Sequence, residues 1–244
     1  MGKTFVIFKR ELASYFITPL AYVFIIIFLF LSGIFTFYVG GFFERNQADL
    51  VSFFQLLPWL FLFLIPAITM RLWSEERKQG TIELMMTLPV SLANAVIGKF
   101  LAAWVFTILT IALTFPLWVT VNYLGEPDNG VILASYIGSS LLAGAFLAIG
   151  AFISALSKNQ VISFVVTVVV CLLFILAGHG VVINFFREWA PEVVVNAISQ
   201  LSLLTNFQSI AKGLIDARAV VYYLSMIVCF LIACAITVDM KKAD

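Results

Sequence analysis

The sequence predicts an all-α integral membrane protein, organised as a single transmembrane domain over residues 1–244. Two properties of the composition support this prediction: 63% of the 244 residues are hydrophobic and only 11% are charged. A soluble domain carries about 25% charged residues, so this chain cannot build an ordinary water-exposed surface. The third observation is the pattern of apolar stretches, because six of them approach or exceed the 20 or so residues that a transmembrane helix needs. These predicted spans are 20–41, 52–72, 94–121, 131–156, 161–185 and 219–239.

Residues 3–17, ahead of the first span, predict an amphipathic helix. At 100° per residue its large apolar side chains gather on one side and its charged side chains on the other, although Val6 and Ile7 interrupt the pattern. Such a helix is expected to lie on the membrane surface and to end before Pro19, where the chain turns into the first span. The alternative is a cytoplasmic extension of that span. The residues chosen for the membrane-surface helix are Phe5, Phe8, Arg10 and Leu12.

The distribution of Lys and Arg among the connecting segments predicts the orientation. Counted by alternate segments, one side carries Lys3, Lys9, Arg10, Arg71, Arg77, Lys78, Lys99, Lys158, Lys241 and Lys242. The other side carries only Arg45, Arg187, Lys212 and Arg218. Cytoplasmic segments are enriched in basic residues. Both termini and the segment between the second and third spans are therefore expected in the cytoplasm.

That segment, residues 73–91, contains the passage "SEERKQGTIELMMTLPVS" between two apolar spans. Its first part is charged, and its second part places Ile82, Met85 and Met86 at helical spacing before a proline. Gly80 would permit a sharp turn between the two parts. The pattern predicts a short cytoplasmic helix that docks on a partner, with methionine supplying adaptable packing. The alternative is an interfacial connector on which nothing docks.

Several kinds of chemistry are missing from the sequence. The spans carry almost no ionisable residues. An ionisable residue within a span is the usual mark of proton or ion coupling. His179 is the exception, and it reads either as a gate or substrate contact or as an interfacial histidine wetted by headgroups. No enzyme constellation and no phosphate-binding loop is present, so we expect no catalytic activity and no cofactor bound by this chain. The net charge of +1 gives no field for nucleic acid. Any energy for uphill transport must come from another protein.

The stretch "RLWSEERKQGTIELMMTLPVSLANAVIGKFLAAW" resembles a motif of the ABC-2 family of transporter permeases. In that motif Glu-Glu-(Arg/Lys) is followed by Gly-Thr, by a glutamate and by Thr-x-Pro-(Val/Leu)-(Ser/Thr). A Gly-Lys pair then opens the third span. The residues at matching positions are Glu75, Glu76, Arg77, Gly80, Thr81, Glu83, Leu84, Thr87, Pro89, Val90, Ser91, Gly98 and Lys99.

The resemblance implies a six-span permease in a bacterial cytoplasmic (inner) membrane, forming half of the membrane part of an exporter. Two copies or two related chains would pair, as a homodimer or heterodimer. Each would engage a separate ATP-binding subunit, which holds the ATP and Mg. The residues that would couple to this subunit are Glu75, Glu76, Arg77, Lys78, Gly80, Thr81 and Glu83. No residue pattern identifies a substrate path.

A second passage, "LSLLTNFQSIAKGLIDARAVVYYLS", is similar to the gliding-motility-associated branch of these permeases. This similarity leaves open an auxiliary subunit with a large outer domain. Residues 187–215 would form outer helices, either re-entrant or ordinary loop helices. Two other functions remain open: a membrane scaffold that recruits an ATPase without transporting, and a secondary transporter. The second would need intramembrane charge or an inverted repeat, and the sequence offers neither convincingly.

Overall fold

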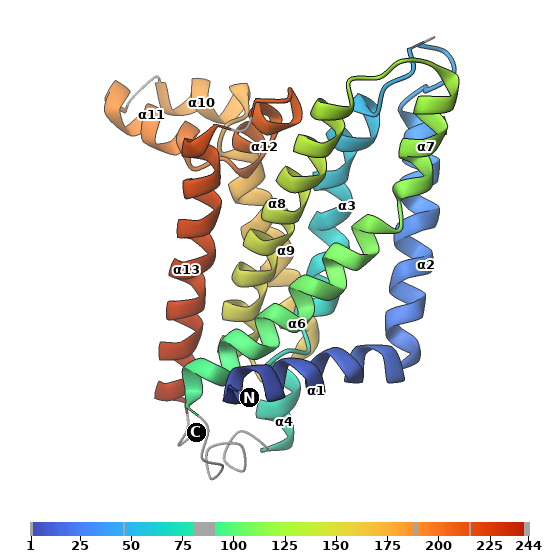
Figure 1. Ribbon diagram of the computed structural model, residues 1–244. Coiled ribbons are helices and arrows are strands. Elements are labelled where there is room, and N and C mark those ends of the chain that lie inside the picture. The colour runs from blue at the N-terminus through green and yellow to red at the C-terminus, as the bar shows by residue number, and fades with distance from the viewer. Residues whose placement is uncertain (1, 46, 81–90, 188–189, 215, 242–244) are drawn as a thin grey trace.

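A computed structural model describes residues 2–45, 47–80, 91–187, 190–214 and 216–241, and every regular element in these ranges is a helix. The long helices stand side by side, and α1 lies across one end of them (Figure 1). Helix α8 is at the centre, packed against α3, α6, α9, α12 and α13.

Helix α1 (Lys3–Ile17) meets α2 (Pro19–Ile34) at a sharp corner. Thr18 between them is extended, with ψ of 138°. Pro19 suits the first position of a helix because it has no N–H to leave unpaired and its φ is already helical. Helix α2 continues into a π-helical turn, η1 (Phe35–Val39), and α3 (Val51–Thr69) returns toward the level of α1.

The predicted span 94–121 is two helices, α6 (Leu92–Ala112) and α7 (Phe115–Leu124). The break precedes Pro116, which cannot donate a helical hydrogen bond. The buried Thr114 hydroxyl donates to the Ile111 carbonyl at 2.7 Å and lies 2.9 Å from the Tyr136 hydroxyl. The break is therefore tied to the next helix.

Helix α8 (Asn129–Leu156) begins with a capped turn, in which the Asp128 carboxylate accepts from the Gly130 and Val131 amides. Most of its residues are buried, and several are small. A Cβ added at Gly150 would lie 2.2 Å from Thr69 Oγ1, so only glycine allows α3 to approach this closely. Close approach over small residues is the usual way in which membrane helices pack.

The predicted span 161–185 is not one helix, and this corrects the sequence analysis. Helix α9 (Gln160–Leu176) ends early, and α10 (Gly180–Arg187) leaves it at an angle of 73°. A Cβ at Gly178 would lie 2.2 Å from Thr205 Oγ1. The chain bends where α12 (Leu203–Ala211) presses against it, and α11 (Glu192–Gln200) lies beside α10 and α12.

Within the described ranges, five helical segments are long and apolar enough to cross a membrane: 21–39, 51–79, 92–124, 129–156 and 217–240. A sixth is reached only if the bent pair α9 and α10 is counted as one span. The last crossing is α13 (Ala217–Met240). Six spans are expected from the sequence; the described residues give five candidate segments, one of which contains the break between α6 and α7, and one bent pair.

The end of α13 lies at the same end of the molecule as α1 and α4 (Ser74–Gln79), while α10, α11 and α12 lie at the opposite end (Figure 1). We refer to these as the α1 end and the α12 end. Their assignment to the cytoplasm and the outside remains a prediction.

Candidate functional site

One face of α1 is built to contact α6. Residues 4, 7, 11 and 15 recur at helical spacing and meet α6 in register between Asn94 and Phe106. The Thr4 hydroxyl donates to Asn94 Oδ1 at 3.1 Å. Ile7 is buried against Gly98, where an added Cβ would lie 2.9 Å from Ile7 Cγ2. The interruption of the predicted apolar pattern at Ile7 therefore marks a second face of α1.

The opposite end of this contact is aromatic. The Tyr15 ring stacks on Phe106 of α6, with 5.1 Å between ring centroids. Phe24 of α2 reaches the same phenylalanine at 5.6 Å. Such pairs contribute about 0.5–1.5 kcal/mol beyond the area they bury. Because α1, α2 and α6 share this cluster, the corner between α1 and α2 is held against α6.

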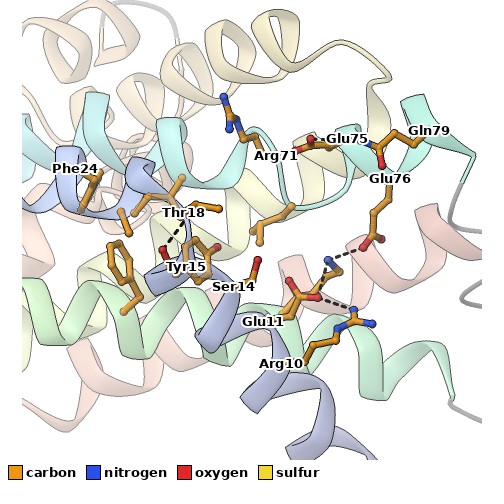
Figure 2. Close-up of a pocket in the computed structure, with 15 residues that line it drawn as sticks. Arg10, Glu11, Ser14, Tyr15, Thr18, Phe24, Arg71, Glu75, Glu76 and Gln79 are labelled. Atoms are coloured by element: carbon orange, nitrogen blue, oxygen red, sulfur yellow. Dashed lines mark hydrogen bonds and ion pairs between the residues drawn. The ribbon is translucent and has the colours of Figure 1, made fainter.

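Lys99 of α6 is the central charge of the site. Only 4% of the residue is exposed, and its ammonium lies 2.8 Å from Glu76 Oε1 and 3.4 Å from Glu11 Oε1 (Figure 2). The ammonium also lies 5.5 Å from the centre of the Trp73 ring. A buried cation needs such partners, because desolvation costs several kcal/mol per ion. Lys99 thus joins α4 to α1 through two carboxylates.

Glu11 is held in its charged form. Burial, the largest influence, raises the pKa of its carboxyl, but the Lys99 ammonium and the Arg10 guanidinium together outweigh it. The Arg10 guanidinium lies 2.7 Å from Glu11 Oε1 on the exposed side. The resulting pKa is below the ordinary value, so the carboxylate is ionised near neutral pH.

Arg77 of α4 contacts a different part of the fold. Its Nη1 donates to the carbonyls of Ala155 and Leu156 at 3.1 and 2.9 Å. These are the last carbonyls of α8, which have no helical partner and carry the negative end of the helix dipole. The Lys241 ammonium at the end of α13 donates to the Leu156 carbonyl at 3.3 Å. Two cations from different elements therefore cap the central helix.

The turn that leads into α4 is fixed by one serine of α8. The backbone amides of Trp73 and Ser74 both donate to Ser154 Oγ at 3.1 Å. The Ser154 hydroxyl is oriented toward the Met70 carbonyl at 3.3 Å. Helix α4 is therefore anchored to α8 at its first residues and again at Arg77.

The structure separates the four charges predicted to meet an ATP-binding subunit. Glu76 and Arg77 contact their own chain, as described above, and Glu75 lines a pocket. Lys78 is exposed on the other side of α4. Gly80 ends the helix with φ of +69°, a left-handed conformation that favours glycine. Thr81 and Glu83, together with the predicted docking residues Ile82, Met85 and Met86, lie outside the described residues.

The four residues predicted for the membrane-surface helix also differ from one another in how exposed they are. Phe5 is 48% exposed, and Arg10 is exposed beside Glu11. Phe8 and Leu12 are half-buried, and Leu12 packs against the core. Contact of this helix with a membrane stays a prediction.

A pocket of about 470 Å³ opens beside the ion pairs, bounded by α1, the start of α2, α4 and α6 (Figure 2). Its charged edge includes Arg71, Glu75 and Glu76, while Phe24 and Phe106 form part of its apolar wall. The pocket is therefore amphipathic, with charged groups on one edge and aromatic rings in its wall.

Sequence reasoning missed two members of this site, Glu11 and Lys99, as functional candidates. Lys99 gave a signal, since it lies inside the predicted span 94–121, so His179 is not the one exception among the spans as the sequence analysis expected. A lysine within a span has to find a partner. Glu11 was visible only as one of several charges on the polar side of α1.

Residues 44–238 match the sequence profile of a family described as ABC-2 family transporter protein. A search of curated proteins found no match. The matched range contains α4, α6 and Lys99, and α1 lies before it. This range covers well over half of the chain. The protein therefore belongs to the ABC-2 transporter family: it is a non-catalytic, multi-pass membrane permease component, and its membership of the family implies an ATP-binding partner.

Proposed function

We propose that this chain is the permease subunit of an ATP-driven exporter, driven through residues 74–91 by a separate ATP-binding subunit that holds the ATP and Mg. Two permease chains, identical or related, would form the membrane part in a bacterial cytoplasmic membrane, with the α1 end in the cytoplasm. The observation that supports this most directly is the double anchorage of α4. This helix is joined to α1 and α6 through Lys99 and to α8 through Arg77.

In this proposal the charges of α4 have two different tasks. Glu76 and Arg77 transmit displacement, because each is bonded to another helix of the chain. Lys78 is exposed and available for a partner surface. When the ATP-binding subunits close, a push on α4 would move α1 and α6 by way of Lys99 and α8 by way of Arg77. Closure of the ATP-binding subunits would thereby change the tilt of the spans.

Two single substitutions separate contact from transmission. Lys78→Glu should weaken copurification of the ATP-binding subunit by about tenfold, since reversing a charge at an interface opposes association. Arg77→Met should leave copurification unchanged but abolish the dependence of ATP hydrolysis on the permease in reconstituted vesicles. If both variants associate and hydrolyse as wild type does, the proposed route through α4 is wrong. Association without any transported substrate would favour the scaffold instead.

The gliding-motility-associated branch adds a further partner to this proposal. The passage before α13 supports that branch, and its auxiliary subunit would carry a large outer domain at the α12 end. Crosslinking in intact cells from Glu192, in α11, would detect such a subunit. Recovery of the ATP-binding subunit alone would argue against the branch.

A further inference from the structure

The pocket between α1, α4 and α6 is lined by more side chains than those of the ion pairs beside it. Its wall changes character along its length. In Figure 2, Phe24 lies on one side, and Glu11, Glu75 and Glu76 lie on the other. Ile68 and Phe106 add apolar side chains to the lining. A volume of about 470 Å³ is within the range of pockets that hold small ligands. Its occupant should therefore have an apolar part and a polar part.

Some charged side chains at the polar end have an oppositely charged partner among the described residues, and others do not. Lys99 is neutralised by Glu76 and Glu11, and Arg10 is paired with Glu11. Arg71 forms no ion pair with any residue that the structure describes. Among the described residues, Glu75 has one hydrogen bond, a long one from Gln79 Nε2 at 3.5 Å. The pocket lining therefore includes a guanidinium and a carboxylate, those of Arg71 and Glu75, that no ion pair among the described residues neutralises.

An available guanidinium and an available carboxylate match the two charges of a zwitterionic headgroup. Arginine binds phosphate through paired hydrogen bonds, and a carboxylate accepts from a primary ammonium. The Ser14 hydroxyl lines the same end and adds a donor or acceptor. An anionic headgroup would satisfy Arg71 but would meet Glu75 with like charge.

The position of the pocket indicates the source of such a ligand. It lies at the corner where α1 passes into α2, which is the first apolar crossing, and Phe24 belongs to that crossing. In a multi-pass membrane protein this corner is at the level of lipid headgroups, with acyl chains beside α2. We propose that the pocket binds one phospholipid with a phosphoethanolamine headgroup, with its phosphate at Arg71, its ammonium at Glu75 and its acyl chains along Phe24.

The test is lipid retention by the full chain in detergent, measured by native mass spectrometry with dioleoyl-phosphatidylethanolamine and dioleoyl-phosphatidylglycerol as probes. Wild type should retain one phosphatidylethanolamine with about tenfold preference, the usual effect of one charge-assisted contact. Arg71→Gln and Glu75→Gln should each lower retention about tenfold. Lys78→Gln, an exposed α4 residue outside the pocket lining, is the matched control and should bind as wild type does.

Three results would overturn the proposal. These are equal retention of the two lipids, wild-type retention by Glu75→Gln, and displacement of the lipid by an equal concentration of free phosphoethanolamine, which would indicate a soluble ligand. Ser14→Trp provides a second variant that fills the pocket without changing a charge, and it should also reduce retention. Circular dichroism and elution volume show that each variant is folded. Because none of these readouts uses ATP, the result does not depend on the proposed export function.

Discussion

Lys99 illustrates how a single residue can connect helices that are far apart in the sequence. Its ammonium is almost fully buried, and the two carboxylates that neutralise it come from α1 and α4. Neither carboxylate is on α6 itself. The energetic importance of such a group lies in what its removal leaves behind, because two carboxylates would then share a poorly solvated space without a cation.

We therefore predict that Lys99→Met destabilises the protein by on the order of 3 kcal/mol, the cost typical of breaking a buried ion pair. Thermal unfolding in detergent measures this loss. Lys78→Met, which removes an exposed charge from the same end, should change stability little. Equal stability of Lys99→Met and wild type would show that the two ion pairs contribute nothing.

The lowered pKa of Glu11 predicts a dependence of stability on pH. Since the folded pKa lies below the ordinary value of 4.5, the carboxylate stabilises the fold above that value. This contribution is lost as the pH falls through the folded pKa. Glu11→Gln removes it at every pH. The difference in melting temperature between wild type and Glu11→Gln should thus be present at pH 7 and should shrink below pH 4.5; a constant difference would contradict the assignment.

Ile7 shows why part of the site could not be predicted from the sequence. A periodicity test assumes that a helix has one apolar neighbour, and by that test Phe5, Phe8 and Leu12 define the membrane side of α1. The structure adds a second neighbour, α6, whose Gly98 accepts Ile7. The sequence does not indicate which transmembrane helix a surface helix will pack against. Charged residues were predictable as a group, but their partners depend on this packing.

At the scale of elements, α4 is a short helix whose end depends on one backbone conformation. Gly80 has φ of +69°, and a Cβ placed on it would meet no atom of the described residues within 4 Å. A substitution there is opposed by the backbone alone. Asparagine tolerates this conformation far better than a β-branched residue does.

Gly80→Val should therefore distort the end of α4, at a cost of about 1–2 kcal/mol, and should reduce the stimulation of ATP hydrolysis by the permease. Gly80→Asn is the matched control and should stay close to wild type. The two variants are compared in reconstituted vesicles with the ATP-binding subunit. Identical activity of both variants would mean that the left-handed turn has no role in coupling.

The helical elements also show the limits of hydropathy. Length and apolarity predicted α8 and α13 to within two residues at each end, since single helices fill these spans. They did not predict the break between α9 and α10, because α10, although less apolar than α9, still carries Val181, Val182, Ile183, Phe185 and Phe186. The bend arises where Gly178 lets Thr205 and Ser202 of α12 approach. That is a long-range contact, and it has no local sequence signal beyond the glycines.

At the scale of the whole molecule, the arrangement in Figure 1 constrains the topology. Helices α1 and α4 and the last turn of α13 share one end, and α12 lies at the other. If a membrane crosses the long helices, every residue of the α1 end must face one compartment and every residue of the α12 end the other. The excess of Lys and Arg at the α1 end predicts that this compartment is the cytoplasm.

Site-directed labelling can test this orientation in intact cells. Cys229 is the one exposed native cysteine among the described residues, so Cys229→Ser gives a background in which Cys171 and Cys234 are buried. Glu126→Cys, in the exposed turn between α7 and α8, should react with a membrane-impermeant maleimide added outside. Gln79→Cys, at the exposed end of α4, should react only after the cells are opened. The reverse pattern would place α4 outside, where no ATP-binding subunit can reach it, and the route of energy through Arg77 and Lys99 would have to be abandoned.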